Sequence, residues 1–191
     1  MTRPALVLAS TSRRRLDLLA QIGITPDRTT DPAIDETPLR AELPRDYARR
    51  MARAKAASLN NSNALVLAAD TAVAAGRRIL PKAESAEQAR TCLTLLSGRR
   101  HRVFTAVVLR GPGNRQTERV VVSIVGFARL TETQLCRYIE SGEWSGKAGG
   151  YAIQGRAAAF VRFLSGSYSN VVGLPLFETA QLLRGAGWSL P

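Results

Sequence analysis

The chain of 191 residues contains only two cysteines and one histidine. Zinc centres built from several histidines, and catalysis that needs two of them, are therefore excluded. His101 lies in a basic run before an apparent strand, which favours a surface or strand-edge position. Cys92 and Cys136 fall on expected helices, where we interpret them as packing residues and not as a disulfide or metal pair. A metal would have to use carboxylates, which favours Mg²⁺ or Mn²⁺.

The sequence also lacks any apolar stretch long enough to cross a membrane. Its opening residues show no basic segment followed by an apolar one, so we expect no export and predict a cytoplasmic protein without membrane association. The apolar content of 45% is enough for a sizeable core. The length predicts a single domain over residues 1–191.

Lysine is scarce: of 27 basic residues only Lys55, Lys82 and Lys147 are lysines, and the net charge is +12. Such a charge can indicate nucleic-acid binding, but the arginines are scattered and not interleaved with stacking aromatic residues. A basic pocket for a phosphorylated small molecule explains the charge equally well. Lysine is a compact point charge that the planar guanidinium of arginine does not replace, so the three lysines are candidates for a position near phosphate or metal.

A hydroxyl-rich turn between an apolar run and a helix is the most informative local pattern. Apolar residues 5–9 predict a buried strand, and Leu16 and Leu19 predict a helix after the turn. Ser12 stands at the expected N-cap. Arg13–Arg15 fill the first helical turn, where the macrodipole is already positive, so the arrangement is unfavourable unless an anion binds. We expect a polyphosphate site here; arginines that extend into water are the alternative.

Strand and helix patterns alternate along the chain, which predicts the α/β class. A turn signal at Gly111–Asn114 joins two strands into a hairpin and makes the sheet mixed. Ser85–Gln88 and Thr131–Gln134 match the capping box of a helix start. Asn60–Asn63 predicts a turn. The expected strands are residues 5–9, 64–69, 103–109, 119–128 and 158–164, and the expected helices run from 44 to about 59, 85 to 98, 131 to about 142 and 175 to 185.

Asp70 is the strongest single candidate for chemistry, because it follows a continuous apolar strand and ligands collect beyond strand ends in open α/β sheets. A carboxylate there can hold a metal or act as a base. Lys82 follows shortly after and suits a phosphate opposite a metal. Glu36, with Asp35, lies in a polar segment that does not by itself indicate a metal site. Gln154 can donate and accept hydrogen bonds, as recognition of a base edge requires, although an ordinary strand glutamine explains it as well.

These candidates occur within a longer series of motifs in a fixed order. The chain resembles the Maf family of nucleoside triphosphate pyrophosphatases over nearly its whole length. The resemblance is carried by Leu8–Arg15, Asp35–Glu36, Ala54–Ala56, Ala69–Thr71, Ile79–Lys82, Leu95–Arg99, Ser141–Glu143, Lys147–Gly149, Tyr151–Gly155 and Val172–Leu176.

The resemblance implies a Maf/ITPase-like mixed twisted sheet flanked by helices, with two lobes around a central cleft. It implies a cytoplasmic, often homodimeric enzyme that cleaves a nucleoside triphosphate between the α and β phosphates with Mg²⁺ or Mn²⁺. The implied catalytic residues are Asp70 and Lys82, and the implied metal-binding residues are Glu36 and Asp70. The residues implied to hold phosphate are Ser10, Ser12, Arg15 and Lys55, with Lys82.

Three further positions imply the dTTP/UTP branch of this family: Arg14, Thr71 and Gln154. The branch that acts on 7-methyl-GTP typically carries Trp, Gln and Glu there. The chain departs from the family pattern at Arg13, where proline is usual, and at Pro81 and Ala83 beside Lys82. Two alternatives remain open at this point: a non-catalytic nucleotide or nucleic-acid binder in cell division control, and a house-cleaning enzyme for modified pyrimidine nucleotides.

Overall fold

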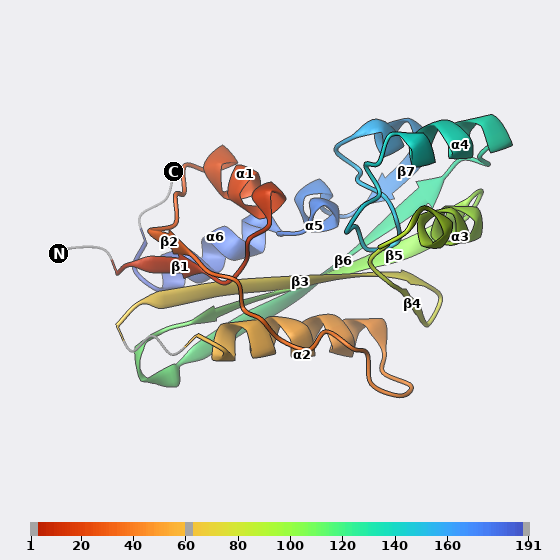
Figure 1. Cartoon of the computed structure of the whole chain (residues 1–191). Helices are drawn as coiled ribbons and strands as arrows, with labels where there is room; N and C mark the ends of the chain where they lie inside the picture. Colours follow the sequence, from red (N-terminus) through yellow and green to blue (C-terminus); the bar gives the residue numbers. More distant parts are fainter. Residues whose placement is uncertain (1–3, 60–62, 189–191) are drawn as a thin grey trace.

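The computed structural model describes residues 4–59 and 63–188, which form one seven-stranded mixed sheet with helices on both faces (Figure 1). The strands are β1 (Leu6–Leu8), β2 (Arg28–Thr29), β3 (Leu65–Ala75), β4 (Arg78–Leu80), β5 (Arg100–Arg110), β6 (Gln116–Phe127) and β7 (Val161–Ser165). The helices are α1 (Arg13–Gln21), α2 (Pro44–Ala57), α3 (Ala86–Leu96), α4 (Glu132–Glu140), α5 (Tyr168–Val172) and α6 (Leu176–Gly185). The α/β class and the mixed sheet predicted from sequence are confirmed.

The strand order is β2-β1-β3-β5-β6-β7, and β4 pairs with β3. β1 runs parallel to β2 and β3, whereas the pairs among β3, β4, β5, β6 and β7 are antiparallel. The parallel part arises because α1 returns the chain after β1, while short turns such as the one at Gly111–Asn114 allow only antiparallel neighbours.

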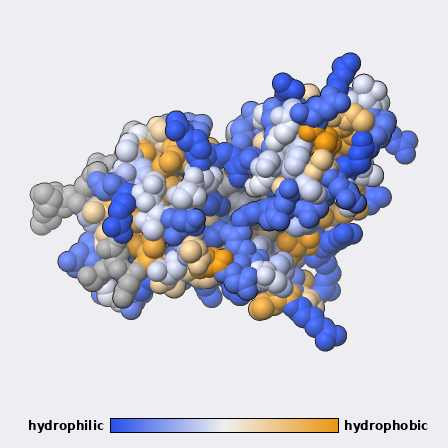
Figure 2. All heavy atoms as spheres, viewed as in Figure 1, coloured by the Kyte–Doolittle hydropathy of each residue, from blue (hydrophilic) through white to orange (hydrophobic). Residues whose placement is uncertain are grey.

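Side-chain alternation along β3 divides the core into three clusters. Val66, Ala68 and Ala72 face α2 on one side of the sheet. On the other side, Leu65 and Leu67 pack with α1 and α6. Farther along the same side, the core is formed with α3 and α4. Two lobes therefore stand on one face of the sheet, as the resemblance implied. Figure 2 shows the surface hollowed between them, with hydrophilic residues gathered there.

The helix starts follow their capping sequences to different degrees. Thr131 and Gln134 form the complete capping box of α4. Ser85 accepts a hydrogen bond from the Gln88 N–H, but the Gln88 side chain accepts from the N–H of Glu84 instead of Ser85, so this box is only half formed. Short elements such as β2, β4 and α5 were not predicted, because they contain too few residues to show a hydrophobic periodicity. The predicted turn at Asn60–Asn63 lies mostly outside the described residues.

Three predictions from sequence were wrong. The strand expected to end before Asp70 continues to Ala75, because β5 pairs with it as far as Ala74. Residues 156–160 form a 3₁₀ helix before β7, where a strand was expected from 158. His101 is not a surface residue: it is 2% exposed, because its position on β5 turns it into the core against Phe127 and Tyr151.

Candidate active site

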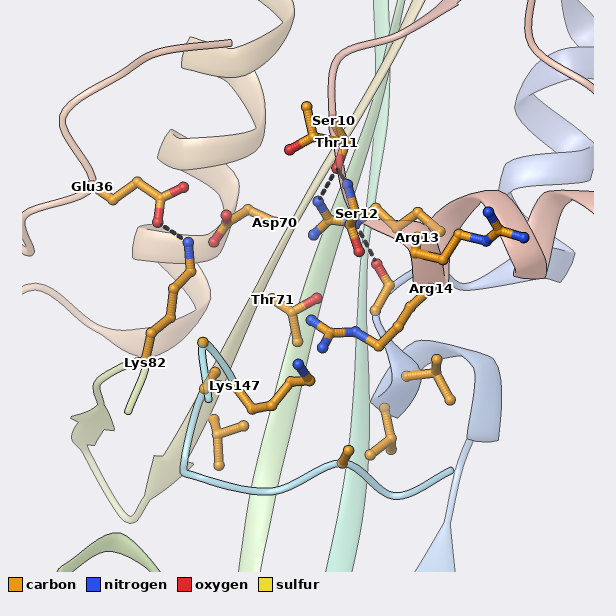
Figure 3. Close-up of a pocket in the computed structure, with 18 of the residues that line it drawn as sticks. Ser10, Thr11, Ser12, Arg13, Arg14, Glu36, Asp70, Thr71, Lys82 and Lys147 are labelled. Carbon is orange, nitrogen blue, oxygen red and sulfur yellow. Dashed lines mark hydrogen bonds and ion pairs between the residues drawn. The ribbon is translucent and has the colours of Figure 1, made fainter. Parts of the chain in front are cut away.

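The candidate site lies at a gap along one edge of β3. On that edge β1 pairs with β3 as far as Leu67, and β4 begins to pair at Val73. Asp70 and Thr71 lie between these two pairings and both line a cavity of about 540 Å³. Because neighbouring residues of a strand point to opposite faces, Asp70 turns toward α2 and Thr71 toward the lobes. The gap brings both side chains to one cavity (Figure 3).

One wall of the cavity is a cluster of two carboxylates and two ammonium groups. Lys55, from α2, places its Nζ 2.5 Å from Asp70 Oδ1 and 2.6 Å from Glu36 Oε1. Lys82, which follows β4, forms an ion pair with the other oxygen of Glu36. Glu36 comes from the irregular segment before α2, so three separate parts of the chain meet Asp70 here. Asp35 does not take part: it is exposed and accepts a hydrogen bond from the N–H of Thr37.

Burial separates the acidities of the two carboxyl groups. Asp70 is 4% exposed, and desolvation raises its pKa despite the opposing charges of Lys55 and Arg15. Burial also pushes the pKa of Glu36 upward, but hydrogen bonds from Lys55 and Lys82 outweigh it and leave that pKa lowered. Such a pair, one carboxyl made more basic and its neighbour kept ionised, is suited to proton transfer beside a fixed charge.

The main chain around Lys82 is held against the segment that carries Lys147. The Ala83 N–H donates to the Lys147 carbonyl at 3.0 Å, and the Gly149 N–H donates to the Pro81 carbonyl at 3.0 Å. The Gly146 N–H donates to the Ala83 carbonyl at 2.9 Å. The unusual residues Pro81 and Ala83 therefore flank a well-bonded bridge that sets the position of Lys82.

Arginines of α1 supply the opposite wall. Arg15 donates hydrogen bonds to the Ser10 hydroxyl and the Gly173 carbonyl, both at 3.0 Å, which fixes its guanidinium inside the site. Arg13 points away and pairs with Asp17 on the exposed side of the helix. Ser12 occupies the predicted N-cap, but its hydroxyl makes no capping bond. Ser10 and Ser12 both line the cavity.

Two further cations face the cavity beside this wall (Figure 3). Burial, and then the charge of Arg15, lower the pKa of Arg14. Burial, and then the charge of Arg14, lower the pKa of Lys147. The Lys147 ammonium donates a hydrogen bond to the carbonyl of Ser145. Because a carbonyl is neutral, this bond does not compensate the positive charge of Lys147. Cations that repel one another in a shared concavity favour a bound polyanion.

All the residues predicted from sequence to form the site line this one cavity. They are Ser10, Ser12, Arg14, Arg15, Glu36, Lys55, Asp70, Thr71, Lys82 and Gln154. Gln154 is exposed and lines the cavity from the turn at residues 153–155. Lys147 lines the same cavity, as the scarcity of lysine led us to expect, although the family resemblance gave it no individual role.

Glu36 and Asp70 are also the residues that could hold a divalent cation. No group of three or more His, Cys, Asp and Glu side chains suited to a metal occurs within residues 4–59 and 63–188. Mg²⁺ is commonly bound by one or two carboxylates together with water and substrate phosphates, so these two hard oxygen donors fit a cation that arrives with a phosphate ligand. No helix in the described part of the chain is long and apolar enough to span a membrane.

Comparison with known proteins places the chain in a family. The family model described as Maf-like protein matches residues 5–186. The dTTP/UTP pyrophosphatase of Rhodospirillum rubrum is 61% identical over 185 residues, which cover 96% of this chain and 88% of that protein. The dTTP/UTP pyrophosphatase of Granulibacter bethesdensis is 59% identical over 199 residues, covering 96% of this chain and 93% of that protein. The match extends across every element that lines the cavity, and the chain belongs to the Maf family.

Proposed function

We propose that this chain hydrolyses dTTP and UTP to the monophosphate and pyrophosphate. The observation that carries the proposal is that two walls of different chemistry face each other across one cavity. A buried carboxylate beside two ammonium groups faces Arg14, Arg15 and Lys147 across a space of about 540 Å³. The relatives named dTTP/UTP pyrophosphatase support the choice of substrate.

Asp70 is the proposed general base. Its raised pKa makes it a better proton acceptor than an ordinary aspartate, and its burial holds it in one position. Asp70 takes a proton from water as the water oxygen forms its bond to the α-phosphorus. The bond from that phosphorus to the bridging oxygen breaks, and pyrophosphate leaves with the electron pair.

Negative charge grows on the leaving pyrophosphate, so the cations of the site are assigned to it and to the α-phosphate. Lys82 and Lys55 lie on the side of Asp70, and we assign them, with Ser10, Ser12 and Arg15, to phosphate binding. Lys147 joins this set because it faces the same cavity. Arg14, Thr71 and Gln154 are proposed to select the base.

Glu36 and Asp70 would hold a Mg²⁺ or Mn²⁺ ion that enters with the triphosphate. When bound, the ion would withdraw charge from the phosphate oxygens. Lys55 and Lys82 now occupy the oxygens of Glu36, so cation binding requires that these ammonium groups turn toward phosphate. Phosphate binding and cation binding therefore support each other.

The test is release of pyrophosphate from a panel of canonical and modified nucleoside triphosphates, with Mg²⁺ or Mn²⁺. Asp70→Asn is the inactive variant, and Asp17→Asn on the exposed side of α1 is the matched control. Preferential turnover of dTTP and UTP is the expected result. Turnover confined to modified pyrimidines would support the house-cleaning alternative, and nucleotide binding without release would support the non-catalytic one.

A cytoplasmic location and a homodimer are further proposals that rest on the family resemblance. Light scattering at micromolar concentration tests the second, and a monomer would contradict it. Nucleic acid is not a proposed partner, because the cationic walls enclose a small cavity. Salt-dependent DNA binding would contradict that view.

A further inference from the structure

Two threonine hydroxyls lie side by side where the cavity meets the sheet core. Thr71 on β3 is paired with Thr105 on β5, and their hydroxyl oxygens are 2.9 Å apart. Thr71 lines the cavity, whereas Thr105 is fully buried. Each hydroxyl has one hydrogen, so only one of the two can donate in this contact.

The direction of this hydrogen bond follows from the next partner. The Thr105 oxygen is also 2.9 Å from the main-chain carbonyl of Asn170, which can accept but cannot donate. The N–H groups of Gly173 and Leu174, which could serve that carbonyl, both donate to Ser169 instead. An unpaired carbonyl in the core is costly, so Thr105 gives its single hydrogen to Asn170. The Thr71 hydrogen must then go to Thr105.

The far end of this chain of hydrogen bonds is anchored in the core. Asn170 is fully buried, and its amide nitrogen donates to the Ser123 hydroxyl at 2.8 Å and to the Val103 carbonyl at 3.2 Å. Ser123 donates in turn to the carbonyl of Ser167 at 3.0 Å. These bonds hold α5 against β5 and β6, so the Asn170 carbonyl cannot turn away from Thr105.

We propose that Thr105 makes Thr71 an acceptor-only group toward the cavity, and that this polarity selects bases with a ring N–H. The ring nitrogen N3 of uracil and thymine carries a hydrogen that Thr71 can accept, whereas N3 of cytosine carries a lone pair that would face the oxygen lone pairs of Thr71. The inference rests on the proposed function and deepens it. Thr105 is a positioning residue, since it acts only through Thr71.

The backbone beside Thr71 leaves room for this contact. Gly173 adopts φ +131°, and a Cβ built on it would lie 3.5 Å from the Thr71 hydroxyl oxygen. The absence of a side chain therefore keeps one side of the hydroxyl clear. Arg15 donates to the Gly173 carbonyl, which ties this glycine to the phosphate-binding wall.

The first test compares binding of three probes by titration calorimetry: the α,β-methylene analogues of UTP, 3-methyl-UTP and CTP, which resist cleavage at the reacting bond. We expect the 3-methyl and cytosine probes to bind about 10- to 100-fold more weakly than the uracil probe, because each leaves the Thr71 acceptor unpaired. Equal binding of the uracil and 3-methyl probes would overturn the inference even if UTP is hydrolysed, so the proposed function would stand. If the probes bind with the expected preference but UTP is not hydrolysed, the proposed function alone would be overturned.

The second test removes the group to which the Thr71 hydroxyl donates its hydrogen. In Thr105→Val the Thr71 hydroxyl loses its acceptor and becomes free to donate into the cavity, so the preference for the uracil probe over the cytosine probe should fall about tenfold. Thr105→Ser retains both bonds and should keep the preference. Thr117→Val, on an exposed position of β6, is the matched control. A merely structural role for Thr105 would lower affinity for both probes alike and leave their ratio unchanged, which would contradict the proposal. If Thr105→Val does not fold, the comparison of the uracil and 3-methyl probes on the unaltered protein tests the proposal.

Discussion

Replacement of Lys55 by methionine should destabilise the protein in a strongly pH-dependent way. The Lys55 ammonium is 2.5 Å from Asp70 and 2.6 Å from Glu36, and the residue is 5% exposed. Methionine keeps the length and apolar stem of the side chain but removes its charge. The two carboxylates then share a partly buried space without the cation that separates them.

The expected magnitude follows from the burial of the partners. Removal of one partner from a buried ion pair typically costs about 3–5 kcal/mol, because it leaves an uncompensated charge. Glu36 keeps its ion pair with Lys82, and its side chain is 29% exposed, so we expect a loss near the lower limit, about 3 kcal/mol. For a chain of this size, that corresponds to a fall in Tm of about 6–12 °C.

The sign of the pH dependence can be derived from the carboxyl groups. Without Lys55, the folded-state pKa values of Asp70 and Glu36 both lie higher than in the unaltered protein. A carboxyl with a raised folded pKa stabilises the fold while it is protonated, and this stabilisation is lost as pH rises through the folded pKa. The deficit of Lys55→Met should therefore be large at pH 8 and shrink toward pH 5.

Thermal and urea unfolding at pH 5 and pH 8 measure this difference. Arg49→Met is the matched control, because its pair with Asp46 is exposed on both sides and lies on the same helix. An exposed pair contributes about 0–1 kcal/mol, so this variant should change stability little at either pH. A deficit for Lys55→Met below about 1 kcal/mol, or one that is the same at both pH values, would refute the reasoning.

Three further predictions concern other parts of the molecule. Asp70→Asn should lower turnover by about 10²- to 10⁴-fold while far-UV circular dichroism stays unchanged, and a rate near normal would contradict its role as base. Substitution of Asp70 should also abolish the acid limb of the pH–rate profile, because a protonated Asp70 cannot take the proton from water. Burial lowers the pKa of His101 to about 4, so folding stability should fall by about 3 kcal/mol from pH 7 to pH 4, and His101→Phe should remove this part of the acid sensitivity. Thr131→Ala should cost about 1 kcal/mol through loss of the α4 cap, measured by urea unfolding, whereas Thr131→Ser should restore it.

Local patterns were sufficient to predict most long elements and to single out Asp70 and Lys82 as candidates, whereas most of the other site residues were implied by the family resemblance. The apolar period and Pro44 predicted α2 to within two residues of its end, and the capping box predicted the start of α4. Such signals are local, since the residues that cap or terminate a helix lie within one turn of it. The three lysines were informative for a different reason: in a chain of 24 arginines, each lysine proved to line the same cavity.

Contacts between distant segments could not be predicted in this way. Nothing local marks Glu36 as the partner of Lys55 and Lys82, because its position depends on how the segment before α2 folds across the end of β1. His101 was misplaced for a similar reason. Its neighbours in sequence are arginines, but strand alternation and the pairing of β5 with β6 turn it toward Phe127 in the core.

The error at Asp70 explains how the site is built. A strand that ended at Asp70 would present one carboxylate at the edge of the sheet. The continuous β3 instead carries Asp70 and Thr71 past a gap between two neighbouring strands, and alternation sends one to each face. Asp70 thereby meets Lys55 on the side of α2, while Thr71 meets Thr105 on the side of the two lobes. Under the proposed function, phosphate chemistry and base selection fall to adjacent residues of one strand, which would fix the distance between the two ends of the substrate without a loop.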